Sequence, residues 1–184
     1  MLNSENTDMT FTFIDAFKLA ATNLISALRS DLSNEDAETI SRELSSEINT
    51  SAAKLKLLVA MIYTKASANE NWASTAVKLF SHLAYSLTNK MHDPELSPSK
   101  SDAHLSGALL LRRYIHTTLQ DDFQDDMATA SWSVPRLWLL AELATNTSPI
   151  RLGPGSRVDI TRRMAESESL LEGQNLELLL EYVH

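Results

Sequence analysis

The sequence predicts an all-α fold, arranged as an α-solenoid in which antiparallel helical hairpins stack side by side. Apolar residues recur at the three- and four-residue spacing of a helix face through most of the chain. Helix breakers are scarce, with four glycines and five prolines in 184 residues, and the links between periodic stretches are short. Each hairpin of a solenoid buries its apolar face against its neighbours. Because no strict repeat is visible, a helical bundle is the structural alternative.

The first helices are expected within a single domain that covers residues 10–184. Residues 1–9 are polar and are expected to form a flexible N-terminus. An amphipathic helix is predicted from Thr10 to Leu28. Ser33 then supplies a capping residue, and the acids after it suit the positive end of a helix dipole, so a second helix is predicted to run to Ile48.

The stretch from Ala53 to Leu87 is predicted to be the central hairpin. Thr50 or Ser51 caps its first helix, Asn69 or Asn71 caps its second, and the polar link between them is short. The predicted inward residues are Leu55, Leu58, Val59, Ile62, Tyr63, Ala66, Trp72, Val77, Leu79, Phe80, Leu83 and Leu87. Neither helix carries an obvious catalytic group, and Lys65 is interpreted as solvated, which indicates a scaffold.

The second half contains two loops and further helices. Residues 88–103 are rich in turn formers, and a helix is predicted from His104 to Phe123, with Leu105, Leu109, Ile115 and Leu119 inward. An acidic connector is expected over 124–131, and Pro135 suits the first turn of the next helix. After a loop at 146–155, the last helical stretches are predicted at 158–171 and 176–183.

Composition narrows the class of protein. The formal net charge is −8, which disfavours nucleic-acid binding because that binding depends on cations at phosphates. The chain has no cysteine, so disulfides and thiolate chemistry are excluded. No signal peptide is recognised at the N-terminus, and no apolar run approaches the ~20 residues of a membrane span. A cytoplasmic protein is expected, with the nucleus as the alternative.

The lack of recognisable catalytic motifs favours a protein that is not an enzyme and holds no metal or cofactor. The five histidines lack metal-ligand spacing, and phosphate-binding and nucleophile motifs are missing. The acidic run from Asp121 to Asp126 is interpreted as a solvated connector, although a metal-dependent hydrolase is a competing hypothesis. The basic pairs Arg112–Arg113 and Arg162–Arg163 are either solvated or contact an acidic partner or RNA.

Four segments carry a resemblance to a known family. These are residues 29–37 (RSDLSNEDA), 62–83 (IYTKASANENWASTAVKLFSHL), 114–123 (YIHTTLQDDF) and 139–143 (LLAEL). Taken together and in order, they resemble the middle domain of the eukaryotic translation initiation factor 4G family, a HEAT-repeat α-solenoid. The resemblance spans nearly the whole chain, from about Phe13 to Tyr182.

The resemblance implies a HEAT-like or ARM-type superhelix that works as a non-enzymatic scaffold in mRNA metabolism or translation initiation. It implies docking of a DEAD-box RNA helicase or another translation or mRNP factor, with RNA as a further partner. Partner-binding residues carried over are Arg29, Leu32, Asn34 and Asp36. Ala37 replaces the family's phenylalanine and Asn34 its usual proline, and the acidic charge makes a protein a better candidate partner than RNA. The alternative is a generic helical assembly module unrelated to RNA.

Overall fold

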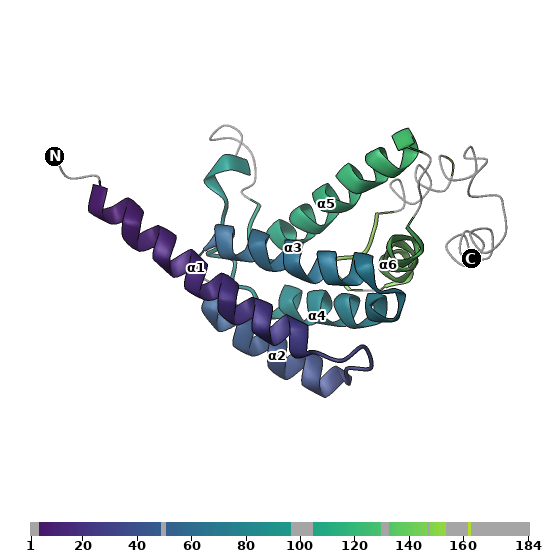
Figure 1. Cartoon of the computed structure of the whole chain (residues 1–184), viewed down its shortest axis with the longest axis horizontal. Coiled ribbons are helices and arrows are strands. Elements are labelled where there is room, and N and C mark those ends of the chain that lie inside the picture. Colours follow the sequence, from purple (N-terminus) through teal and green to yellow (C-terminus); the bar gives the residue numbers. More distant parts are fainter. Residues whose placement is uncertain are drawn as a thin grey trace.

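The computed structural model is built from helices, as the sequence predicts (Figure 1). It describes residues 4–48, 51–96, 105–129, 133–146, 148–153 and 162. The α-helices are α1 (Ser4–Ala27), α2 (Asn34–Ile48), α3 (Ala52–Ala68), α4 (Ala73–Ser86), α5 (Gly107–Thr129) and α6 (Val134–Thr145). Two short 3-10 helices, η1 (Glu70–Trp72) and η2 (Pro94–Leu96), complete the described elements. The all-α prediction is confirmed for this part of the chain, in which no β-strand is found.

Local signals start three helices where the sequence predicts. The Ser33 hydroxyl accepts a hydrogen bond from the Asp36 amide at 3.0 Å and donates one to the Asp36 carboxylate at 2.7 Å, which begins α2. Ser51 accepts from the Lys54 amide at 3.3 Å and begins α3. Pro135 lies in the first turn of α6, where its missing N–H costs no helical hydrogen bond.

Helices that are two apart in the chain pack on one another. α1 lies against α3, α2 against α4, α3 against α5 and α4 against α6. In Figure 1, α2 lies below α1, α4 lies below α3, and α6 is seen nearly end-on at the right-hand end of α3 and α4. The α2–α4 contact is more extensive than the contact between α3 and α4, although α3 and α4 are consecutive.

The central position of the 53–87 stretch is confirmed. All twelve residues predicted to point inward from it are buried, among them Trp72, Phe80 and Ile62. They belong to one continuous apolar core that also takes in side chains of α1, α2, α5 and α6. Burial of this apolar surface is the main stabilising contribution to the fold.

Several predicted boundaries are wrong. α1 begins at Ser4, six residues before the predicted helix start at Thr10. α5 continues to Thr129 through most of the predicted acidic connector, because tertiary ion pairs on this segment outweigh the weak helix propensity of aspartate. Leu109, predicted to point inward, is 55% exposed.

α5 begins later than predicted, at Gly107, where only glycine fits. Its φ is +51°, in the left-handed region that side chains disfavour. A Cβ at this position would lie 3.0 Å from Asn89 Oδ1 and 3.1 Å from the Thr88 carbonyl oxygen. Close approach to the preceding loop therefore fixes where α5 starts.

Some predictions fall outside the described residues. These are the helical stretches at 158–171 and 176–183, apart from residue 162, together with Arg163. Among the helices that the structure describes, none is long and apolar enough to cross a bilayer.

Candidate partner-binding surface

The turn between α1 and α2 is held by Lys65 of α3. The Lys65 ammonium donates hydrogen bonds to the carbonyl oxygens of Ser26 at 3.3 Å and Leu28 at 2.9 Å, and a short one to Ile25. The last carbonyls of a helix lack intrahelical partners and carry the negative end of its dipole. An ammonium group there supplies hydrogen-bond donors to these carbonyls and a favourable positive charge. The same ammonium lies 4.5 Å from the centroid of the Trp72 ring. Burial lowers the pKa of Lys65 from its usual value. Lys65 is therefore a structural cap whose side chain is half-buried, so it takes part in packing as well as in solvation.

Two residues of α4 hold the remainder of the turn. Thr75 donates to the Ser30 carbonyl oxygen at 2.7 Å, and the Lys78 ammonium donates to the Leu32 carbonyl oxygen at 2.9 Å. Side chains of α3 and α4 thus occupy the backbone acceptors on the inner side of this turn. The backbone conformation of the turn is fixed by the helices beneath it.

The residues carried over from the family resemblance lie on this turn or at the start of α2. Arg29 is 81% exposed and forms a bidentate ion pair with Asp31, with both N–O distances at 2.9 Å. Asn34 and Asp36 are also exposed. Leu32 is half-buried and packs on the core, so it contributes more to the fold than to an exposed apolar anchor.

A groove between α1 and α2 is a feature that the sequence did not reveal. It has a volume of about 390 Å³ and is bordered by α1, α2 and Lys54 of α3. Its lining is Phe13, Ala16, Phe17, Ala20, Ala21, Leu24, Glu43, Leu44, Glu47 and Lys54. The α1 residues in this set recur at intervals of three and four, which is one face of a helix. That spacing was visible in the sequence, but it predicts burial and does not distinguish a covered face from an open one.

Lys54 closes one side of this groove. Its ammonium donates to the Glu47 carbonyl oxygen at 3.2 Å and lies 5.2 Å and 5.8 Å from the ring centroids of Phe17 and Phe13. Cation–π contacts of this kind stabilise by roughly 0.5–1 kcal/mol at exposed sites. The contact keeps both rings at the groove.

The basic pairs lie on other elements than the turn. Arg112 and Arg113 belong to α5, where Arg112 is half-buried with its guanidinium beside Gly153, and Arg113 is exposed. Arg162 is exposed. Burial, together with the charge of Arg112, lowers the pKa of His116, whose Nε2 lies 3.4 Å from the Ile150 carbonyl oxygen. The basic pair of α5 therefore lies on a different element from Arg29, Asn34 and Asp36.

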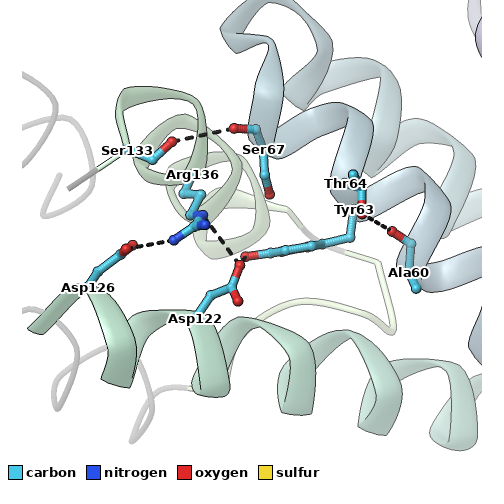
Figure 2. A network of polar contacts seen from close by, with 8 residues as sticks. All are labelled: Ala60, Tyr63, Thr64, Ser67, Asp122, Asp126, Ser133 and Arg136. Carbon is cyan, nitrogen blue, oxygen red and sulfur yellow. Dashed lines mark hydrogen bonds and ion pairs between the residues drawn. The ribbon is translucent and has the colours of Figure 1, made fainter. Parts of the chain in front are cut away.

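The acidic run of α5 takes part in a polar network with α3 and α6 (Figure 2). Tyr63 donates to Asp122 at 2.7 Å, and Arg136 donates to Asp126 at 2.6 Å. Arg136 Nε lies 3.3 Å from Asp122 but does not form a hydrogen bond, so this contact is Coulombic. Burial raises the pKa of Asp126 even though Arg136 acts against the shift. Burial and the bond to Asp122 raise the pKa of Tyr63.

This network is suited to joining helices. The guanidinium of Arg136 contacts both carboxylates that point toward α6, while Asp121 and Asp125 are exposed. Over the residues that the structure describes, no group of three histidine or acidic side chains is arranged to hold a metal ion. The arrangement links α3, α5 and α6 electrostatically.

No family model, curated protein or solved structure matches this chain. The resemblance to the middle domain of the initiation factor 4G family therefore stands on the four sequence segments.

Proposed function

We propose that this chain is a non-enzymatic helical scaffold that binds a protein partner in mRNA metabolism or translation initiation. The partner proposed is a DEAD-box RNA helicase or another translation or mRNP factor, met in the cytoplasm or, alternatively, in the nucleus. The proposed binding surface is the turn between α1 and α2 with the first turn of α2.

The observation that carries the proposal is the way in which this turn is held. Lys65, Thr75 and Lys78 bind its backbone from below, while Arg29, Asn34 and Asp36 remain exposed. A segment that is already ordered loses little conformational entropy when a partner binds, so more of the contact energy contributes to affinity. A polar, exposed and rigid turn is suited to protein recognition.

The packing order agrees with the proposed α-solenoid. In stacked hairpins, the first helix of one hairpin lies on the first helix of the next, and the second helices do the same. The contacts of α1 with α3, α3 with α5, α2 with α4 and α4 with α6 follow that order. α3 also packs on α6, and α4 also packs on α5. The contacts between helices that are two apart are the part of the packing that supports a HEAT-like superhelix.

RNA is proposed as a secondary partner only. The chain carries 24 acidic and 16 basic residues, which weakens the attraction for phosphates. Arg113 is exposed on α5, but its neighbour Arg112 is half-buried beside Gly153. A protein surface complementary to Arg29 and Asp36 is the better candidate.

Affinity purification from a eukaryotic extract, with and without RNase, tests the proposal. Recovery of a DEAD-box helicase in both arms is expected, followed by direct binding of the purified helicase. The double variant Arg29→Glu/Asn34→Lys should weaken that binding at least about tenfold, which corresponds to roughly 1.4 kcal/mol. Arg113→Glu makes the same charge change as Arg29→Glu on a different helix and should leave helicase binding unchanged.

The alternative function predicts a different set of recovered proteins. If no helicase, translation factor or mRNA-associated protein is captured, the proposal fails and the generic assembly module is favoured. Capture that disappears with RNase would instead make RNA the direct ligand. Circular dichroism of each variant verifies that the helices remain folded.

A further inference from the structure

The groove between α1 and α2 is a second surface, separate from the turn. Its lining residues occupy positions 13–24 in the middle and C-terminal part of α1 and positions 43–47 near the end of α2, and they include none of Arg29, Asn34 and Asp36. In Figure 1, the N-terminal part of α1 projects beyond the other helices. α3 covers one side of α1, and the groove lies along another side of α1.

The floor and one wall of this groove are apolar. Phe13 is 68% exposed, Ala16 and Ala20 are exposed, and Phe17 and Leu44 form the buried floor. Small side chains at Ala16 and Ala20 leave space beside the large ring of Phe13. An apolar strip flanked by aromatic residues is the surface onto which an amphipathic helix docks its own apolar face.

The second wall carries negative charge. Glu43 and Glu47 follow one another by one helical turn on α2, both are exposed, and no ion pair to either is found among the described residues. Lys54 is the only cation among the described lining residues, and it is engaged by the Glu47 carbonyl oxygen and by the rings of Phe13 and Phe17. The whole chain has a net charge of −8, so its field also attracts cations over longer distances.

We propose that this groove binds a basic amphipathic helix of a partner protein. The apolar face of that helix lies on Phe13, Phe17 and Leu44, and lysine or arginine residues along its edge face Glu43 and Glu47. Phe13 and Leu24 are about three helical turns apart, or roughly 16 Å, which sets the length of the docked helix at about three to four turns. Apolar anchors would recur in it at the three- and four-residue spacing of one face.

Selection from a displayed library of helical peptides tests this inference. Peptides of about 14 residues carry apolar residues on one face, and the flanking positions vary among Lys, Arg, Glu and Ser. Selection on the full chain, with counter-selection on its Phe13→Ala variant, should enrich Lys and Arg at the flanks. An enriched peptide, measured by fluorescence anisotropy, should lose at least about tenfold in affinity with Phe13→Ala.

Matched variants separate the two parts of the site. Leu19→Ala removes a similarly exposed apolar side chain of α1 that does not line the groove, and should leave peptide affinity unchanged. Glu43→Lys/Glu47→Lys should weaken binding at least about tenfold, whereas Glu70→Lys/Asp121→Lys, with the same change in net charge, should have a much smaller effect. The Arg29→Glu/Asn34→Lys variant should bind the peptide normally, which separates this inference from the proposed function of the turn.

Four outcomes would overturn the inference. The first is a selection that enriches nothing over the Phe13→Ala variant, and the second is enrichment of acidic or uncharged flanks. The third is self-association: if sedimentation shows dimers of the full chain that Phe13→Ala dissociates, a second copy occupies the groove. Unchanged peptide affinity in Glu43→Lys/Glu47→Lys would equally contradict the charge argument.

Discussion

Two regions of the molecule differ in how far their side chains are paired. Side chains at the groove between α1 and α2 are exposed, whereas polar side chains at the junction of α3, α5 and α6 contact one another. At the groove, the ring of Phe13 is exposed, and no ion pair to Glu43 or Glu47 is found among the described residues. At the junction, Tyr63, Asp122 and Arg136 are paired with one another between three helices. The charged groups of the junction have partners within the chain, whereas the groove presents exposed apolar and charged side chains.

The difference indicates which region supplies stability and which supplies binding. Removing a side chain from the junction leaves buried groups without partners, and this costs folding free energy. Removing an exposed ring from the groove costs the isolated chain little. Substitutions in the core and at the junction should therefore lower the free energy of unfolding more than substitutions at the groove.

Trp72→Ala should lower the free energy of unfolding by about 3–5 kcal/mol, because Trp72 is 1% exposed in the core next to α6. The substitution also removes the ring that faces the Lys65 ammonium. Urea denaturation followed by circular dichroism measures the loss. Trp138→Ala, at a half-buried position, is the matched control and should cost less. Equal losses would contradict the placement of Trp72 at the centre of the core.

Arg136→Met should lower the free energy of unfolding by about 1–3 kcal/mol, because it leaves Asp126 partly buried without its cation. The Arg136 side chain is 31% exposed, so solvent screening keeps the effect below that of a fully buried pair. Replacing both partners, in Arg136→Met/Asp126→Leu, should recover part of the loss. A double variant less stable than Arg136→Met would show that the ion pair is not the source of the effect.

The histidine beside Arg112 should make stability depend on pH. The pKa of His116 is lowered in the folded chain, so the unfolded chain binds the proton more readily. Stability is therefore retained above a pH of about 6.5 and falls as the pH drops toward the folded pKa. The slope should stay well under about 1.4 kcal/mol per pH unit, because His116 is only half-buried. Denaturation at several pH values, compared with His116→Gln, measures it; identical profiles would contradict the prediction.

Phe13→Ala should lower the free energy of unfolding by no more than about 1 kcal/mol, since its ring is mostly exposed and loses mainly the cation–π contact with Lys54. The same denaturation experiment as for Trp72→Ala measures it. A loss comparable with that of Trp72→Ala would place the ring in the core and remove the contrast between the two regions.

The sequence predicted the helices better than it predicted their ends and exposures. Ser33, Ser51 and Pro135 determine local hydrogen bonding or φ, and each began a helix as expected. The predicted end of α5 was wrong because the observed end depends on Arg136, whose pairing with Asp126 is set by tertiary packing. The spacing of residues along the sequence does not show which distant residue will become a tertiary partner.

The candidate surfaces show the same limit. Lys65 looks like a solvated residue in sequence, yet it binds three carbonyl oxygens of a segment nearly 40 positions away. The apolar stripe of α1 predicted a buried face, but its exposure depends on how far α1 and α2 lie apart. Partner identity was indicated only by the family resemblance, and the turn residues chosen from it remain a prediction.

The way in which α1 is attached has a consequence for local unfolding. Over the described residues, α1 packs mainly on α3, and its C-terminal carbonyls are held by Lys65. A helix anchored along one side and at one end opens without disrupting the remaining core. Amide hydrogen exchange should therefore be fastest toward the N-terminal end of α1 and slowest in α3 and α4. A docked helix in the groove would slow exchange in α1 and reduce that gradient.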